Sequence, residues 1–215
     1  MNTWLLATRN RGKRAELTPM LAAHGITVMT LDEVGVAVHP DEDRIEVFDT
    51  FEDNALAKAR YFAARTGMPC LADDSGLCID ALDGAPGVRS RRFAADHGHL
   101  SINAQNEDAA NNEAMVDACW NSGRAPPWSA RYACAAAYCD DTREHVVTGY
   151  AEGAVQPDSD GSEGFGYDPF FVSHDLGFSF GRASREAKAG ISHRGRAVSA
   201  LLAIVLSKHE RDDTR

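Results

Sequence analysis

Residues 71–93 read LADDSGLCIDALDGAPGVRSRRF, and the fold and chemistry predicted for this chain both start from that segment. Its apolar beginning ends in two adjacent carboxylates, Asp73 and Asp74, which Ser75 and Gly76 follow at once. We expect a strand that ends in these acids at a tight turn, where a carboxylate points toward a ligand and holds a hard cation such as Mg²⁺. An Asp-Asp pair at a turn is also typical of a plain solvated loop. Other segments of the sequence are needed to distinguish a metal-binding turn from a solvated loop.

The flanking sequence alternates between strand-like and helical patterns. Short apolar runs predict strands over residues 4–8 and 27–31, and longer runs predict a hairpin of 129–139 and 144–155 around the turn 140–143. Periodicity and capping residues predict helices over 13–25, 50–67, 103–121 and 193–209, with Pro19 kinking or shortening the first. Residues 156–164 are expected to form a flexible acidic loop. This order predicts an α/β protein with a mixed sheet.

Size and composition are typical of a soluble globular protein. The chain has 215 residues, 44% of them apolar and 25% charged, which is enough for one core drawn out into two lobes. We expect one two-lobed domain over residues 1–208 and a charged tail over 209–215. No apolar run approaches the roughly 18 residues that a membrane span needs. Arg9 comes too early for a signal peptide, so a cytoplasmic location is expected.

Charge and cysteine content exclude several classes of partner and site. The net charge of −10 argues against duplex DNA or an anionic membrane. A small anionic ligand stays compatible, because local basic clusters and a metal can reverse the field within one site. The cysteines show neither a CxxC pair nor zinc spacing, and we expect them to be reduced core residues. They are Cys70, Cys78, Cys119, Cys134 and Cys139.

The first segment suited to phosphate is a predicted strand-to-helix turn near the N-terminus. The free N–H groups at a helix start favour anions, and a lysine adds a point charge. The turn lacks P-loop spacing, so a P-loop kinase is not supported. A basic helix start also occurs for purely structural reasons. The residues of this turn are Thr8, Arg9, Asn10, Arg11, Gly12 and Lys13.

Two polar residues of the helix predicted over 50–67 form the second segment. Asn54 and Lys58 are four residues apart, so they share a helix face that is displaced from the apolar stripe. That face can offer an amide and an ammonium group to a ligand. The alternative is a lysine that simply faces solvent. Asp53 is already explained by a capping box with Thr50.

Two further segments, GFGYDPF over 164–170 and ISHRGR over 191–196, carry groups suited to a nucleobase. Glycines let the backbone approach a ligand, an aromatic ring can stack on a base, and arginine and histidine donors suit phosphate or a carbonyl. The alternative for the first is a Gly-Pro turn carrying core aromatics. The candidate residues are Phe165, Gly166, Tyr167, Asp168, Lys188, His193 and Arg194. Together with the acids and lysines, they point to a nucleoside polyphosphate.

In these segments the chain resembles the inosine triphosphate pyrophosphatase family, which hydrolyses non-canonical purine nucleoside triphosphates. The matching stretches occur in family order and at family-like spacing over nearly the whole chain. They are ATRNRGK (7–13), TFEDNALAKAR (50–60), ADDSGL with GAPGVRSRRFA (72–94), GFGYDPFF (164–171) and SHRGRA (192–197). Each stretch alone is weakly specific, but the set is highly specific.

The resemblance implies a fold, partners and a site. It implies an elongated mixed β-sheet flanked by helices, two lobes with a substrate cleft between them, a homodimer and dependence on Mg²⁺. By position, Asp74 is implied to be the general base and a metal ligand, with Asp73 beside it and Glu46 as a second metal ligand. Ser75 is implied to contact substrate, and the turn 8–13 to hold the phosphates. The segments 165–168 and 188–194 are implied to grip the base and nearby groups.

We expect the chain to hydrolyse ITP, dITP and XTP to a monophosphate and pyrophosphate, with Lys13 and Lys58 stabilising the leaving group. One alternative is a pyrophosphatase for modified pyrimidine or methylated nucleotides. Another is a nucleotide-sensing module without turnover, which the presence of all three acids disfavours. Arg9 departs from the small residue that many family members have at its position, so the geometry of the phosphate turn is open.

Overall fold

The structure is a computed structural model that describes residues 2–99 and 106–212. By its internal contacts the chain divides into two compact units, and each combines segments that are distant in sequence. Unit 1 comprises Met1–Asp74, Cys134–Gly149 and His193–Arg215. Unit 2 comprises Ser75–Ala133 and Tyr150–Ser192. Each unit is described separately below.

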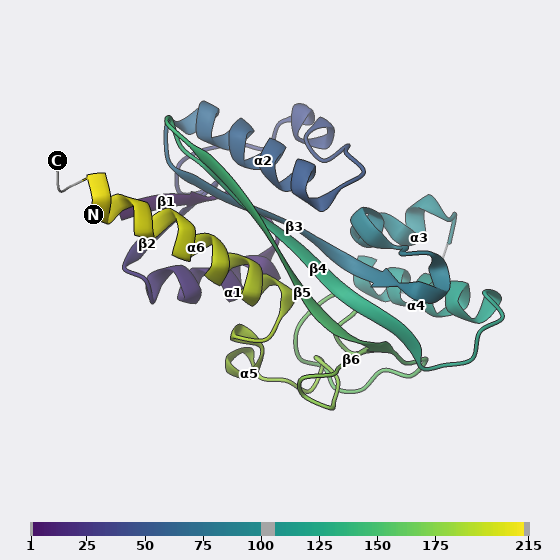
Figure 1. Cartoon of the computed structure of the whole chain (residues 1–215). Coiled ribbons are helices and arrows are strands. Elements are labelled where there is room, and N and C mark those ends of the chain that lie inside the picture. The colour runs from purple at the N-terminus through teal and green to yellow at the C-terminus, as the bar shows by residue number, and fades with distance from the viewer. Residues whose placement is uncertain (1, 100–105, 213–215) are drawn as a thin grey trace. The chain divides into compact units, whose positions relative to one another are not determined.

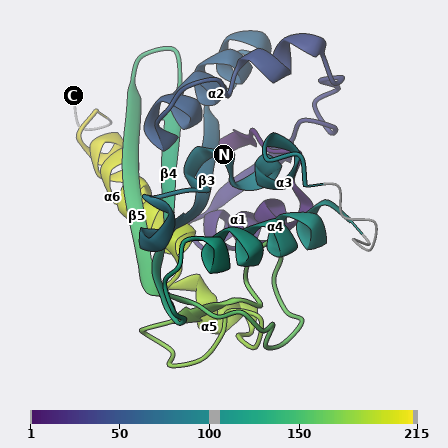
Figure 2. The ribbon, with the colours of Figure 1, turned by 90° about the vertical axis from the view of Figure 1, so that its right-hand side faces the viewer.

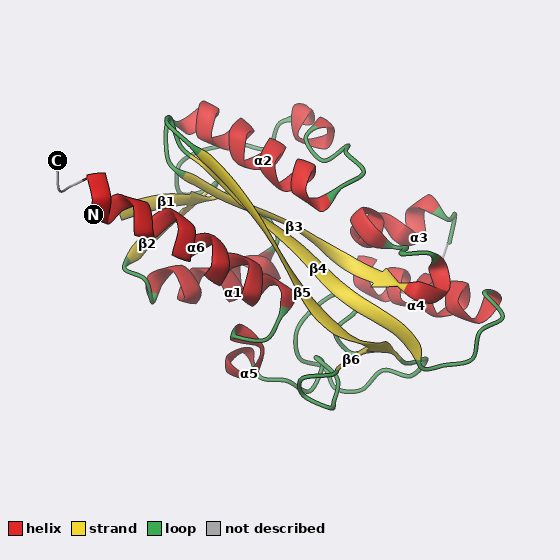
Figure 3. Ribbon diagram, in the orientation of Figure 1, coloured by secondary structure: helices red, strands yellow, loops and turns green. Residues whose placement is uncertain are grey.

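A six-stranded mixed sheet forms the framework, in the order β2-β1-β3-β4-β5-β6 (Figure 1). β1 pairs in parallel with β2 and β3, whereas β5 and β6 are antiparallel. The strands are β1 (Asn2–Leu6), β2 (Ile26–Thr30), β3 (Cys70–Ile79), β4 (Trp128–Cys139), β5 (Glu144–Val155) and β6 (Phe171–Ser173). The predicted α/β class with a mixed sheet flanked by helices is confirmed, and Figure 3 shows the strands and helices in separate colours.

In unit 1, helices cover both faces of the sheet. α2 (Phe51–Thr66) packs on one face, and α1 (Arg11–Ala22) and α6 (His193–Asp212) pack on the other (Figure 1). Successive side chains of β3 point to opposite faces of the sheet, because side chains alternate along a strand. Leu71 belongs to the α1/α6 core and Ala72 to the α2 core. Two acids that follow in the same strand must therefore point to opposite faces.

The two elements with the strongest local signals form as predicted. The Thr50 side chain caps α2 by accepting from the Asp53 N–H, and Gly67 ends the helix in the left-handed conformation at φ 67°. β4 and β5 are neighbours joined by the turn 140–143, in which the Asp140 N–H donates to the Arg143 carbonyl at 3.0 Å. Figure 2 shows the two strands running beside each other into this turn.

Several predicted boundaries are wrong. α1 begins at Arg11 and runs through Pro19 to Ala22. α4 (Glu107–Asn121) begins after Asn106, whose side chain accepts from the Ala109 N–H, whereas the predicted residues 103–105 lie outside the described residues. α6 continues to Asp212, past the predicted end at 209, because its charged end consists largely of residues compatible with a helix.

β3 does not stop at the two acids, which corrects the prediction of a turn at Ser75 and Gly76. It continues to Ile79, because Gly76 lies against another segment of unit 2. A Cβ at this glycine would overlap the Gly87 carbonyl oxygen. The Ser90 hydroxyl accepts from the Leu77 N–H at 2.9 Å. The glycine therefore permits close packing instead of a chain reversal.

Unit 2 has its own apolar core, built from β-strand residues and three helical segments. These are η2 (Asp80–Leu82), α3 (Phe93–Asp96) and α4, and the unit also contains η3 (Gly87–Arg92) and α5 (Arg185–Ala189). Phe171 packs on Tyr132 and Phe180 at ring-centroid distances of 4.8 and 5.1 Å. The segment 156–164, predicted to be a flexible loop, is tied down by backbone bonds such as Glu163 N–H to the Gly181 carbonyl at 2.7 Å.

The five cysteines, all among the described residues, largely agree with the prediction of reduced core residues. All five cysteines are free thiols, and four of them are buried. Among the described residues, no helix combines the length and the apolar character that crossing a membrane requires.

Candidate active site

Asp73 lies at the centre of a buried charge cluster in unit 1. Its side chain is 0% exposed, and Oδ2 contacts Lys13 Nζ at 2.9 Å and Arg194 Nε at 3.1 Å. Arg194 also forms an ion pair with Glu16, one turn along α1 from Lys13. α1 and α6 thus deliver two cations and a second carboxylate to the strand that carries Asp73.

This cluster keeps Asp73 ionised. Burial opposes the charge, but Lys13 and Arg194 hold the pKa of Asp73 well below its ordinary value. Burial likewise opposes the charge of Arg194 and would lower its pKa. The carboxylates of Asp73 and Glu16 outweigh this effect and raise the pKa of Arg194 above its ordinary value. An acid with two close cations is a poor proton acceptor, so Asp73 is better suited to positioning lysine than to acting as a base.

Asp74 lies on the opposite face of β3, beside α2. Asn54 Nδ2 donates to Asp74 Oδ2 at 3.1 Å. The amide of Asn54 is fixed in turn by the Phe48 backbone, with bonds of 2.9 and 3.1 Å. Burial raises the pKa of Asp74 above its ordinary value, although Lys13 and Lys58 act in the other direction. Of the two acids, Asp74 has the pKa that suits a general base.

Lys58 is partly buried instead of facing solvent, so the solvent-exposed alternative is wrong. Its side chain is 12% exposed, and Nζ donates to the Asp73 carbonyl oxygen at 3.0 Å. Lys13 Nζ lies 3.5 Å from the same oxygen. Burial alone would lower the pKa of Lys58, but Glu46, Asp74 and Asp73 raise it above the ordinary value. Two ammonium groups therefore converge on one carbonyl, next to the carboxylate of Asp74.

Glu46 joins this cluster from the segment before α2. It forms an ion pair with Lys58, and this cation outweighs the effect of burial and lowers the pKa of Glu46. Its charge also helps to raise the pKa of Asp74. Within the described ranges, no group of three His, Cys, Asp or Glu side chains could hold a metal. Mg²⁺ usually uses only one or two carboxylates plus substrate phosphates, and Glu46 with Asp74 fits that pattern.

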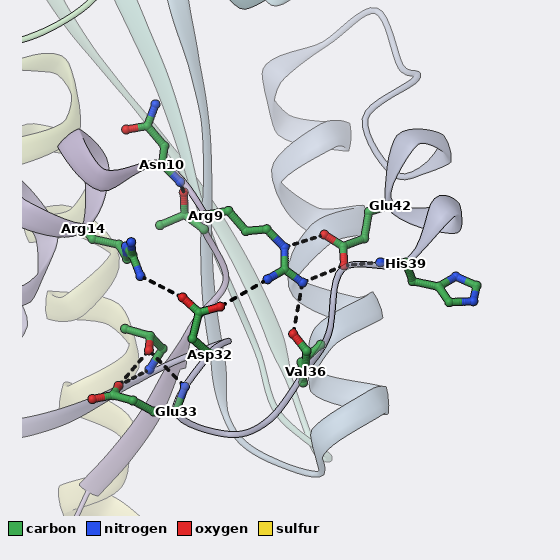
Figure 4. Close-up of polar contacts among 10 residues, drawn as sticks. Arg9, Asn10, Arg14, Asp32, Glu33, Val36, His39 and Glu42 are labelled. Atoms are coloured by element: carbon green, nitrogen blue, oxygen red, sulfur yellow. Dashed lines mark hydrogen bonds and ion pairs between the residues drawn. The ribbon is translucent and has the colours of Figure 1, made fainter.

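The predicted phosphate turn is well ordered at the start of α1. The Thr8 hydroxyl accepts from the Asn10 N–H at 3.2 Å, and Asn10 caps α1 by accepting from the Lys13 N–H at 3.0 Å. Arg11 and Gly12 form the first residues of the helix. The guanidinium group of Arg9 is paired with Glu42 through two bonds of 2.8 Å (Figure 4).

The predicted base-binding residues of unit 2 form a second rigid group. Lys188 Nζ and Asp168 Oδ2 are 2.7 Å apart in an ion pair that is at most 6% exposed. The same carboxylate accepts from the Phe165 N–H at 2.9 Å, and the Gly166 N–H donates to Asp108 at 2.9 Å. The backbone N–H groups of Phe165 and Gly166 are therefore both bonded to carboxylate side chains.

Tyr167 fits the alternative of a core aromatic. It is 5% exposed, and its hydroxyl donates to the Ser90 carbonyl at 2.7 Å. Phe165 is partly exposed. Ser75 is partly exposed in β3, directly after Asp74, and His193 is buried at the start of α6.

The structure thus brings the predicted residues together in two groups. Unit 1 gathers Lys13, Glu46, Asn54, Lys58, Asp73, Asp74 and Arg194, and unit 2 gathers Phe165, Gly166, Asp168 and Lys188. Sequence reasoning missed Glu16, although its position three residues after Lys13 places both on one face of a helix. It also gave Arg194 a contact with the base, whereas the guanidinium group is occupied by Asp73 and Glu16.

Comparison with known proteins gives consistent matches along the chain. The model of the Ham1 family matches residues 4–204. A Streptomyces avermitilis protein named dITP/XTP pyrophosphatase is 40% identical over 207 residues, covering 95% of this chain and 98% of the relative. A protein of the same name from Nitratidesulfovibrio vulgaris is 41% identical over 202 residues, covering 93% and 94%.

Solved structures agree with these sequence matches. A HAM1 protein from Coxiella burnetii has a TM-score of 0.79 at 33% identity, covering 96% of this chain and 100% of that one. A nucleoside-triphosphatase / dITP/XTP pyrophosphatase from Mycobacterium abscessus has a TM-score of 0.68 at 35% identity, covering 93% and 98%.

Proposed function

The chain belongs to the Ham1 family, and from this premise we propose that it is a Mg²⁺-dependent pyrophosphatase for dITP, XTP and ITP. The products are a nucleoside monophosphate and pyrophosphate. The observation that carries the proposal is the meeting of Lys13 and Lys58 at the Asp73 carbonyl, beside the carboxylate of Asp74. The family resemblance predicted from five short segments is confirmed by the match over residues 4–204.

Asp74 takes the role of general base. A base must hold its proton weakly enough to be ionised at neutral pH and strongly enough to accept one from water. Burial moves the pKa of Asp74 in the useful direction, upward from an ordinary aspartate. Asn54 donates to one oxygen of the carboxylate and fixes its orientation toward the water.

Glu46 and Asp74 would hold Mg²⁺ together with oxygens of the triphosphate. This assignment is supported by the all-oxygen donor set and by a shared neighbour, Lys58, whose pKa both carboxylates raise. When bound, Mg²⁺ neutralises phosphate charge and makes a coordinated water more acidic.

Lys13 and Lys58 stabilise the negative charge that develops on the leaving pyrophosphate. Their ammonium groups come from helices on opposite faces of the sheet and are held in place before substrate arrives, so little reorganisation is needed during the reaction. The Asp73 carboxylate holds the Lys13 ammonium group in place through an ion pair. Arg194 pairs with the same carboxylate and is itself paired with Glu16. We assign Asp73, Arg194 and Glu16 to positioning, and the turn 8–13, through its backbone, to binding the phosphates.

The preference for a 6-oxo purine is assigned to donor groups. Lys188 and His193 offer hydrogen-bond donors that suit the carbonyl of hypoxanthine or xanthine, where adenine carries an amino donor of its own. An unsatisfied buried donor costs about 1–3 kcal/mol, so each such contact gives roughly 5- to 150-fold discrimination. Phe165 supplies the stacking surface, and Ser75 contacts the substrate beside Asp74.

The proposal extends to the organisation of the protein. Residues 1–208 form one catalytic domain, and charged residues predominate in the sequence over 209–215. The protein acts as a homodimer on the cytoplasmic nucleotide pool, without a nucleic-acid or membrane partner. The match over 94–98% of the relatives' length supports a domain of the same kind.

A substrate panel tests the proposal. The purified chain is incubated with dITP, XTP, ITP, dATP, dGTP and dTTP, each with Mg²⁺ and with excess EDTA. We expect high kcat/KM for the first three, low values for the others and none with EDTA. A preference for modified pyrimidine or methylated nucleotides would replace the purine assignment, and nucleotide binding without turnover would indicate a sensor.

A further inference from the structure

Arg9 holds three points of the segment that follows β2. Its Nε and Nη2 atoms bind the two carboxylate oxygens of Glu42 at 2.8 Å each (Figure 4). Nη2 also donates to the Val36 carbonyl at 3.2 Å, and Nη1 lies 3.6 Å from Asp32. We call this set of contacts the Arg9 brace.

The Arg9 brace has the geometry of a strong ion pair. A planar guanidinium group that binds both oxygens of a carboxylate gives the most directional form of this interaction. The Arg9 side chain is 28% exposed and that of Glu42 17%, so solvent screens the pair only in part. The hydrogen bond from Arg9 is the main cause that lowers the pKa of Glu42. Glu42 is therefore ionised and paired at neutral pH.

A triphosphate that bound Nε or Nη2 would have to displace Glu42 or the Val36 carbonyl. All three guanidinium nitrogens already face oxygen atoms of the protein. Direct contact with phosphate, the role that the sequence predicts for Arg9, would therefore compete with Glu42 for Nε and Nη2.

Short connections lead from the Arg9 brace to Glu46. Glu42 sits in the single-turn helix η1 (Pro40–Arg44), where its side chain accepts from the His39 N–H at 3.1 Å. Its carbonyl accepts from the Ile45 N–H at 3.2 Å. Ile45 is 9% exposed and packs in the core beneath α2, and the next residue is Glu46.

At its other end the Arg9 brace begins in the phosphate turn. Arg9 stands between Thr8 and Asn10, the residues that order the turn leading to Lys13. One side chain therefore ties this turn to the segment that carries Glu46.

We infer that Arg9 is a positioning residue, which acts through Glu42 to hold Val36–Glu46 so that Glu46 meets Lys58 and the metal. This inference rests on the proposed function. Partners that orient metal ligands typically change metal affinity or activity by about 10–100-fold when they are removed. Arg9 acts one step further away, so an effect at the lower end of this range is expected.

The test compares Arg9→Met and Glu42→Gln with a matched control, Arg60→Met. Arg60 makes a similar two-pronged pair with Glu144, but on α2 and β5 and with a more exposed side chain. Two quantities are measured: the Mg²⁺ concentration for half-maximal dITP hydrolysis, and amide hydrogen exchange without nucleotide.

We expect Arg9→Met and Glu42→Gln each to raise the half-maximal Mg²⁺ concentration by roughly 10-fold, with kcat recovering at high Mg²⁺. The double variant should be no worse than either single one, because both remove the same contact. Exchange should accelerate over Val36–Glu46 but not over α2, and Arg60→Met should change neither quantity. If Arg9→Met unfolds the protein, Arg9→Lys serves as the second variant, because lysine keeps the positive charge but cannot bind both carboxylate oxygens of Glu42 in the same plane. It should also raise the half-maximal Mg²⁺ concentration and accelerate exchange over Val36–Glu46.

Three results would overturn the inference. One is a higher KM for dITP at saturating Mg²⁺ without a changed metal requirement, which would make Arg9 a phosphate contact after all. Another is equal behaviour of the Arg9 and Arg60 variants. The third is unchanged exchange over Val36–Glu46. If the wild-type protein hydrolyses no nucleotide, the proposed function has failed, and hydrogen exchange alone decides whether Arg9 holds the segment.

Discussion

The two neighbouring acids of β3 should respond in opposite ways to the same substitution. Asp73→Asn removes a negative charge from a side chain that is 0% exposed and contacts Lys13 and Arg194 at 2.9 and 3.1 Å. Removing one member of a buried ion pair typically costs about 3–5 kcal/mol, because the partner's charge stays buried. Arg194 keeps Glu16, and the new amide oxygen can still accept one hydrogen bond, so we expect the lower part of this range.

The expected shift in melting temperature follows from the size of the protein. For a chain of about 200 residues, 1 kcal/mol changes Tm by roughly 2–4 °C, so Asp73→Asn should lower Tm by about 6–12 °C. The folded-state pKa of Asp73 is below its unfolded value, so its charge stabilises the fold above the unfolded pKa of about 3.9. The loss should therefore be complete at pH 7 and should shrink only as the pH falls below about 4.

Asp74→Asn is the matched control, since it is the same substitution one residue along the strand. The pKa of Asp74 is raised in the folded state, so its stabilising contribution is lost as the pH rises through that raised value. At pH 7 its charge opposes folding, and Asp74→Asn should melt at or above the wild-type temperature. Thermal unfolding of all three proteins, followed by circular dichroism at pH 7 and near pH 4, gives the comparison. An Asp73→Asn protein that melts with the wild type, or equal losses for both variants, would refute the charge assignment.

Other predictions concern turnover. Asp74→Asn should reduce kcat for dITP by about 10²–10⁴-fold, and single-turnover assays that show a near-normal rate would remove it as the base. Lys13→Ala should reduce kcat/KM by about 10²–10³-fold, and an unchanged steady-state value would show that Lys13 does not stabilise the transition state. Because the pKa of Asp74 is raised, the acid limb of the pH profile of kcat/KM should have its midpoint above about 4, the ordinary aspartate value; a midpoint below that would contradict its assignment. EDTA should abolish pyrophosphate release, and excess Mg²⁺ should restore it; activity that survives EDTA would contradict the metal requirement.

Sequence reasoning worked where the signal is local. The capping residues of α2 lie three positions apart, and the turn of the β4–β5 hairpin spans four residues. The shared face of Asn54 and Lys58 likewise follows from helix periodicity alone, and both side chains do reach the acids of β3. Such features depend on neighbours in sequence, so tertiary packing did not overrule them.

Features that depend on distant contacts could not be predicted in the same way. Gly76 was interpreted as a turn because nothing in the sequence shows that the Gly87 carbonyl packs against it. The ion pair of Arg194 with Glu16 joins residues that are 178 positions apart. Arg9 looked like a phosphate ligand because its partner Glu42, 33 positions away, lies in a segment without a recognisable pattern.

The most direct test of the account is product analysis of dITP hydrolysis by the wild-type protein and the Asp74→Asn variant with Mg²⁺, using ³¹P NMR. We predict that the wild type forms dIMP and pyrophosphate in equal amounts and no orthophosphate, and that folded Asp74→Asn forms neither product at a comparable rate. Release of orthophosphate with dIDP, or full turnover by Asp74→Asn, would contradict a pyrophosphatase site built on Asp74, Lys13 and Lys58.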